Sequence, residues 1–244
     1  MQIKNWNNAD IEIVESKGGV KVTINPYDNL IKTNILPWPP LEILQKLYLS
    51  NHQNSFDKSI VWDLGYYSDI QSLNSEDALT WSYFGTLAYA DTNVKVKFLQ
   101  NLFKLLQINY TCTIEHVKIS LWRRIPHPDT LVSGGPELDF TIQSENVFLI
   151  GEAKWLSGIS VHQGKKKDKD QIELREDFLK KYSRRIFPDL EIADVLCLSF
   201  YPFNHQSALN LTWHDLIYAN IHPLNDELVR YYEWKIINNN RIFI

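Results

Sequence analysis

The chain has 244 residues, of which 44% are hydrophobic and 22% charged, and a net charge of -4. This length and apolar content are typical of a folded α/β protein with one sizeable core, and they argue against disorder. Because no apolar run approaches the roughly 20 residues of a membrane span and the N-terminus lacks the apolar region of a signal peptide, the sequence predicts a cytoplasmic protein without a membrane partner.

The first third of the chain shows no chemical motif. Residues 11–13 and 20–24 alternate apolar and polar side chains around Lys17-Gly18-Gly19, which predicts a β-hairpin. A short helix is expected at 41–48, after the proline-rich break at 37–40. We therefore predict an N-terminal extension at 1–70, followed by a core at 71–244.

Two helices and a strand are expected to open this core. Ser75 is a favourable N-cap, Glu76 complements the helix dipole, and apolar residues follow at helical spacing. A second helix is expected at about 94–107, with a purely structural apolar face. The first core strand is expected at 114–122.

A predicted hairpin then brings charged groups together. Two apolar strands, at 140–143 and 147–150, flank a turn-rich segment. A two-residue loop would pair Asp139 with Glu152 and would set Glu137 opposite Lys154, whereas a three-residue loop would pair Asp139 with Gly151. The expected site therefore depends on the loop length.

Two carboxylates beside a lysine suit metal-assisted phosphodiester chemistry. Mg²⁺ prefers carboxylate oxygen and water, and two carboxylates leave open positions for a phosphate and an attacking water. A nearby ammonium group can orient that water or balance charge in the transition state. Asp139, Glu152 and Lys154 are the candidate residues, and Glu137 is a rival to Asp139 for the metal.

The segment after Lys154 is strongly basic. Residues 154–185 carry ten basic side chains against five acidic ones, although the whole chain has a net charge of -4. A basic segment next to a metal site is suited to a phosphate backbone. A solvated loop and helix face is the alternative. The same segment predicts a helix at 170–186, with Leu174, Phe178, Tyr182 and Ile186 facing inward, and a buried strand is expected at 193–200.

Two further helices are expected near the end of the chain, one capped by Thr212 and one at 226–235. Cys112 and Cys197 are expected to be buried free thiols, and the histidines match no zinc pattern.

Asp139 and Glu152-Ala153-Lys154 resemble the motif of the PD-(D/E)XK nuclease superfamily, and the resemblance covers roughly residues 75–221. It implies an α/β fold with a restriction-endonuclease-like mixed β-sheet core (α-β-β-β-α-β) flanked by helices, and a metal-dependent nuclease whose substrate is most often DNA. It also implies Mg²⁺ as cofactor, with Mn²⁺ as a substitute. A homodimer is compatible with it.

The resemblance assigns roles residue by residue. Asp139, Glu152 and the carbonyl of Ala153 would bind the metal, and Lys154 would assist the water. Glu76 matches a helix glutamate that completes the metal site in many members, with dipole complementarity as its alternative. Gln171 and Arg175 match positions near the scissile phosphate, and a polar pair on the helix surface is the alternative. The expected nucleic-acid-binding residues are Lys165, Lys166, Lys167, Lys169 and Arg175.

Two other functions stay open on the sequence. One is a nucleic-acid-binding module that keeps the fold without turnover. The other is an interaction protein in which the charged residues form a structural ion cluster.

Overall fold

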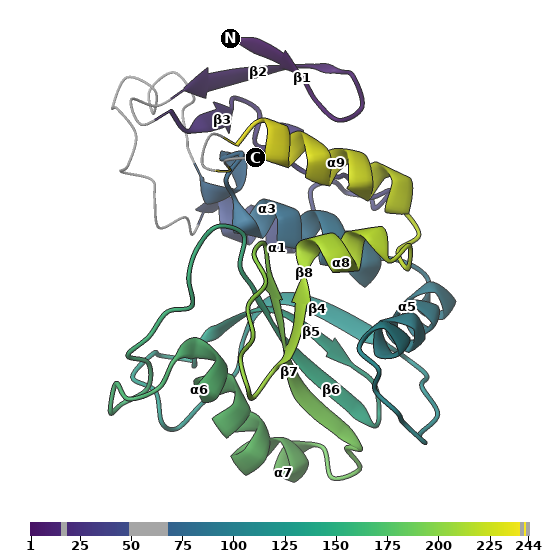
Figure 1. Ribbon diagram of the computed structural model, residues 1–244, viewed down its shortest axis with the longest axis vertical. Coiled ribbons are helices and arrows are strands. Elements are labelled where there is room, and N and C mark those ends of the chain that lie inside the picture. Colours follow the sequence, from purple (N-terminus) through teal and green to yellow (C-terminus); the bar gives the residue numbers. More distant parts are fainter. Residues whose placement is uncertain (16–18, 49–67, 240–241, 243–244) are drawn as a thin grey trace. The chain divides into compact units, whose positions relative to one another are not determined.

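The computed structural model (Figure 1) describes residues 1–15, 19–48, 68–239 and 242. Its contacts divide the chain into two compact units, one of residues 1–89 and 224–244 and the other of residues 90–223. This division differs from the predicted boundary after residue 70, because residues 71–89 and the last helix belong with the N-terminal strands. The class is α/β, with one five-stranded mixed sheet and one three-stranded antiparallel sheet.

The first unit contains the small sheet. Its strands are β1 (Gln2–Lys4), β2 (Asp10–Glu15) and β3 (Lys21–Thr23), in the order β1-β2-β3. The predicted hairpin is confirmed in β2 and β3, which pair antiparallel. Lys17 and Gly18 of its predicted turn lie outside the described residues, and β1 was not predicted.

Short helices complete this unit. They are η1 (Pro26–Asn29), α1 (Leu41–Tyr48), η2 (Asp69–Gln71), α3 (Glu76–Thr80), η3 (Trp81–Gly85), α4 (Thr86–Ala88) and α9 (Asn225–Ile237). The Ser75 cap is confirmed, since the hydroxyl of Ser75 accepts a hydrogen bond from the backbone N–H of Ala78 at 3.0 Å. The predicted apolar stripe behind it, Leu79, Tyr83 and Leu87, is fully buried.

The second unit is built on the mixed sheet (Figure 1). Its strands are β4 (Lys118–Arg124), β5 (Glu137–Gln143), β6 (Val147–Ala153), β7 (Ile192–Ser199) and β8 (Leu209–Thr212), and they neighbour one another in that order. The first three form an antiparallel meander, and β6, β7 and β8 are parallel. The central strand β6 is buried along its whole length, as its apolar run predicted.

Helices of the second unit are α5 (Thr92–Leu105), α6 (Gln171–Phe178), η4 (Leu179–Ser183), α7 (Arg184–Ile186) and α8 (Trp213–Tyr218). Helix α6 and its continuation pack on the sheet through a core that includes Ile150, Ile172, Phe178 and Val195. The prediction that Ile186 faces inward was wrong, because its side chain is 56% exposed. The π-helical turn η4 adds a residue to the turn before α7 and rotates the following side chains away from the stripe.

The motif hairpin has the register that the site requires. Phe140 pairs with Gly151, and the ladder continues to Gln143 opposite Phe148. The N–H of Ser144 donates to the carbonyl of Val147 at 2.9 Å, which leaves residues 145 and 146 as a two-residue loop. The loop length on which the prediction depended is therefore confirmed, and the next positions in this register are Asp139 and Glu152.

Within the residues that the structure describes, none of the helices combines the length and apolar character that a membrane span needs.

Candidate functional site

The candidate site lies at the carboxyl end of β6, the middle strand of the large sheet. Gly151 is the last apolar position before the charges, and a Cβ atom there would overlap the ring of Phe140. Glu152 follows on this strand with only 1% of its surface exposed. A carboxylate at such a depth requires compensation, because burying an unpaired charge is costly.

Two cations compensate the Glu152 carboxylate. The Lys154 ammonium lies 2.7 Å from Oε1 of Glu152, and the Arg175 guanidinium lies 3.5 Å from Oε2. Arg175 comes from α6 and also donates to the carbonyl of Glu137 at 2.9 Å. Its side chain is buried, and its Nε and Nη1 atoms have no hydrogen-bond partner among the residues that the structure describes. The guanidinium therefore retains donors beside Glu152 that a bound anion could use.

Asp139 reaches the same strand from β5. Its Oδ2 atom accepts a hydrogen bond from the N–H of Ala153 at 2.7 Å, so the carboxylate binds the backbone between Glu152 and Lys154. Asp139 is half-buried. The hairpin register and this hydrogen bond together bring Asp139 to the Glu152-Ala153-Lys154 segment, as the sequence predicted.

The thiol of Cys197 reports the electrostatics of this cluster. Cys197 pairs with Glu152 across β6 and β7. Burial raises the pKa of the Cys197 thiol to about 12, the Glu152 and Asp139 carboxylates also raise this pKa, and Lys154 lowers it. The charges of Asp139, Glu152 and Lys154 thus all affect the pKa of this one thiol. Cys197 is a buried free thiol, as expected, whereas Cys112 is only partly buried.

The backbone of Lys154 is fixed from both sides. Its N–H donates to the carbonyl of Leu198 on β7 at 2.7 Å, and its carbonyl accepts from the indole N–H of Trp213 at 3.1 Å. The side chain is 10% exposed. The ammonium therefore extends from a fixed backbone position, and its flexible stem is the part able to move.

The donor set fits a hard divalent cation. The Asp139 and Glu152 carboxylates and the Ala153 carbonyl are oxygen ligands of the kind Mg²⁺ prefers. No cluster of three or more His, Cys, Asp or Glu side chains able to hold a metal occurs in the part of the chain that the structure describes. A cation here would thus take two carboxylates and would complete its coordination with backbone oxygen, water and phosphate.

Two other predicted residues lie on helices and not on the hairpin. Glu76 is the first residue of α3 in the first unit, and its metal role stays a prediction. Gln171 begins α6, where its N–H donates to the carbonyl of Ser160 at 3.0 Å and its side-chain oxygen accepts from the N–H of Ser160 at 3.2 Å. These contacts tie the segment after Lys154 to α6.

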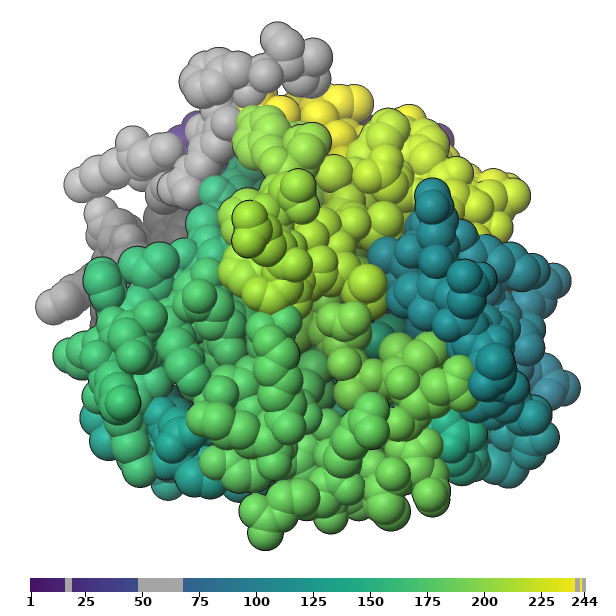
Figure 2. Space-filling model, turned by 60° about the horizontal axis from the view of Figure 1, so that its bottom comes forward, coloured from purple at the N-terminus to yellow at the C-terminus, as the bar shows by residue number. Residues whose placement is uncertain are grey.

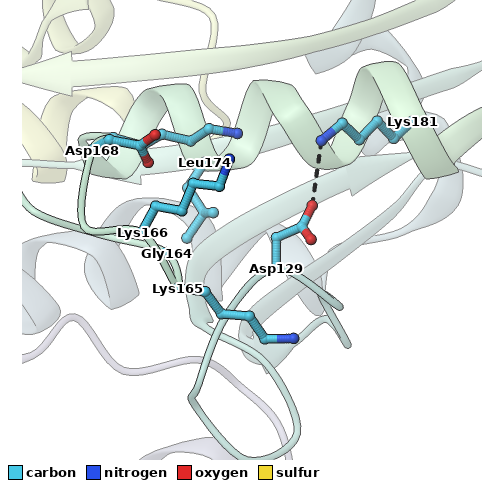
Figure 3. Close-up of a pocket in the computed structure, with 8 residues that line it drawn as sticks. Asp129, Gly164, Lys165, Lys166, Asp168, Leu174 and Lys181 are labelled. Atoms are coloured by element: carbon cyan, nitrogen blue, oxygen red, sulfur yellow. Dashed lines mark hydrogen bonds and ion pairs between the residues drawn. The ribbon is translucent and has the colours of Figure 1, made fainter.

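Three predicted lysines line one cavity of about 240 Å³ (Figure 3). The side chains that give it charge are Lys165, Lys166, Lys169 and Lys181, with Asp129 and Asp168. The Lys181 ammonium lies 3.3 Å from the Asp129 carboxylate and 2.9 Å from the Asp177 carboxylate. The Lys169 ammonium lies 2.8 Å from the Asp177 carboxylate. These two lysines lower the pKa of the Asp177 carboxyl, although burial opposes them.

The remaining predicted basic residues lie elsewhere. Lys167 is exposed and is not among the lining residues of this cavity, and Arg175 belongs to the Glu152 cluster. Lys181 was not among the residues predicted to bind nucleic acid. The spacing of Lys181 from Asp177, one helical turn, could have indicated their pairing, but its position beside the lysine-rich loop depends on the tertiary fold.

Comparisons with protein-family models, curated proteins and solved structures found no match for this chain.

Proposed function

We propose that the protein is a metal-dependent nuclease that hydrolyses phosphodiester bonds of nucleic acid, with DNA favoured as substrate. The observation that carries this proposal is the pairing of Lys154 with Glu152 at 2.7 Å, on a strand whose backbone is bound by Asp139. The order of elements in the second unit, α5-β4-β5-β6-α6-β7, supports the resemblance to the PD-(D/E)XK superfamily.

In this proposal, Asp139, Glu152 and the Ala153 carbonyl hold Mg²⁺ or Mn²⁺. When bound there, the cation would supply Lewis-acid activation of the phosphate and of water. Lys154 orients the attacking water and places positive charge where the transition state gains negative charge. Arg175 holds the Glu152 carboxylate in place, and its unpaired Nε and Nη1 atoms are donors for a phosphate oxygen.

The net charge of the cluster affects how tightly the free protein can bind the metal. Asp139, Glu152, Lys154 and Arg175 sum to zero when all four are ionised. A divalent cation would leave this buried cluster with two positive charges, which a phosphate backbone can offset. We therefore expect weak metal binding by the free protein and tighter binding when nucleic acid is present.

The main competing function is an interaction protein with a structural ion cluster. The specific observation in its favour is that Lys154 and Arg175 already form ion pairs with the Glu152 carboxylate. On this alternative, nucleic acid would not increase the affinity of the protein for Mg²⁺. Titration calorimetry with Mg²⁺, with and without a non-hydrolysable oligonucleotide, separates the two functions.

Cleavage assays test the proposal directly. Supercoiled, linear and single-stranded DNA and RNA would be incubated with Mg²⁺, with Mn²⁺ and with EDTA. Asp139→Asn removes charge but keeps an acceptor for the Ala153 N–H, and Lys154→Met keeps the apolar stem. We expect both variants to lose metal-dependent cleavage. Thermal unfolding should change little in Asp139→Asn, whereas Lys154→Met should also lower stability, since it leaves the buried Glu152 with one cation fewer, so cleavage is measured well below the unfolding temperature of each variant.

The matched controls are Asp189→Asn and Lys104→Met, which alter exposed residues of the same two types. Both controls should cleave at the wild-type rate. Undiminished metal-dependent cleavage by Asp139→Asn and Lys154→Met would exclude the proposed site. If the wild-type protein binds DNA but cleaves it under none of these conditions, the protein is instead a catalytically silent nucleic-acid-binding module.

A further inference from the structure

A second cavity, of about 190 Å³, begins at Lys154 itself. It is formed by the segments that follow β6 and β7, two parallel neighbours in the sheet, and its lining includes residues 154–159 and 199–203. Ligands of α/β proteins commonly bind outside the carboxyl ends of parallel strands. Figure 2 shows a face on which the green part of the chain, which includes α6, reaches the surface.

Aromatic rings form the main wall of this cavity. Trp155 is 1% exposed and makes an edge contact with Phe200, with ring centroids 4.8 Å apart. Phe200 in turn makes an edge contact with Tyr201, also at 4.8 Å. The inner rings are thus fixed by packing, whereas Tyr201 and Phe203 are 58% and 40% exposed. The outer rings present apolar faces to water.

The size and charge of the cavity restrict the class of ligand that it can bind. Its volume is below the roughly 300–1,000 Å³ of sites for drug-sized ligands, so it suits a single planar ring system. Lys154 is the one charged residue among the lining residues that the structure describes. A planar ring attached to a negatively charged group would therefore place the ring among the aromatics and the negative group beside the ammonium.

We propose that this cavity holds an unstacked nucleobase of the nucleic acid, whose adjoining phosphate lies at Lys154. The substrate is then single-stranded, or carries an unpaired base at the cleavage position. This inference rests on the proposed function, because Lys154 is both a wall of the cavity and a member of the Glu152 cluster. Aromatic side chains commonly bind bases in this way, since every base has a flat face on which a ring can stack.

Binding to oligomers without cleavage tests the inference. The probes are a fluorescently labelled single-stranded oligothymidylate and an abasic oligomer of equal length, which carries the same phosphates without bases. Affinity would be measured by anisotropy in EDTA, so that catalysis cannot contribute. We expect Tyr201→Ala and Phe203→Ala each to weaken binding of the base-bearing oligomer about 5- to 150-fold, as expected for the loss of about 1–3 kcal/mol of stacking. Their affinity for the abasic oligomer should stay at the wild-type value.

A matched control is Tyr218→Ala, which removes an aromatic ring that is 44% exposed and does not line the cavity. This variant should bind both oligomers as the wild type does. Thermal unfolding of all variants checks that they fold. Equal affinity of the wild type for both oligomers, or unchanged binding in the two cavity variants, would overturn the inference and leave the exposed rings as a surface for another protein.

Failure of the base pocket and failure of the proposed catalysis give different results. If Tyr201→Ala and Phe203→Ala cleave at the wild-type rate and also bind the base-bearing oligomer as the wild type does, that result excludes the base pocket and leaves the nuclease proposal intact. Base-dependent binding without any cleavage would support the pocket and reject the nuclease.

Discussion

The buried amine of Lys235 predicts a measurable dependence of stability on pH. Lys235 lies on α9 with none of its surface exposed, and within the described part of the chain its Nζ atom has no hydrogen-bond partner. The Nζ atom lies 5.6 Å from the centroid of the Tyr231 ring. Burial lowers the pKa of this ammonium from its ordinary value to about 7. Above this pKa, the folded protein therefore favours the neutral amine.

The sign and size of the effect follow from linkage. In the unfolded chain the amine has a pKa of about 10.4, so between pH 7 and that value the unfolded state binds one more proton than the folded state. The free energy of unfolding should then rise by about 1.4 kcal/mol per pH unit, or by about 4–5 kcal/mol across the whole window. Below pH 7 both states bind the proton, and the penalty of burying the charged amine is complete.

The measurement compares the wild type with Lys235→Met. Urea unfolding, followed by tryptophan fluorescence from pH 7.5 to 9.5, gives the free energy of unfolding at each pH. Lys235→Met should be the more stable protein at pH 7.5, and its advantage should shrink by about 1.4 kcal/mol per pH unit. The control is Lys32→Met, which alters an exposed lysine of the same unit. Parallel stability curves for the wild type and Lys235→Met would refute the reasoning.

Two further predictions concern the site. Gly151→Ala should destabilise the protein by about 1–3 kcal/mol, because its Cβ would overlap the Phe140 ring, and adding Phe140→Leu should recover part of the loss in thermal unfolding. A loss unaffected by that second change would argue against the overlap. Arg175→Met should cost on the order of 3 kcal/mol in urea unfolding, since it leaves the buried Glu152 with one cation fewer. Unfolding at the wild-type urea concentration would show that Glu152 does not depend on Arg175.

The hairpin was predictable because its determinants are local. A turn-rich segment between two apolar strands located the hairpin, and it left a loop of two or three residues open. The two-residue loop of the structure sets the register that pairs Phe140 with Gly151. Asp139 and Glu152 follow from that register. The Ser75 cap was predictable for the same reason, since it requires only the residue and the three that follow it.

Other features depend on the tertiary fold and were not predictable in this way. Strand β8 has only four half-buried residues and joins the sheet through parallel pairing of Leu209 with Leu196, a partner distant in sequence that its short alternating pattern does not reveal. Arg175 lies on a helix, where the alternatives were a surface position or a phosphate contact. Its burial against Glu152 depends on where α6 packs on the sheet.

The ion cluster is poorly explained by stability alone. A buried ion pair contributes little net stability, because the desolvation of both charges offsets their attraction, and apolar side chains of similar volume often do as well. Here Glu152 and Arg175 are almost completely buried, and two donor atoms of the guanidinium have no partner among the described residues. An arrangement selected for stability would pair those donors or omit the charge. In the proposed nuclease these donors would serve a phosphate oxygen, and the Lys154 ammonium, which pairs with Glu152 and lines the aromatic cavity, would lie beside that phosphate.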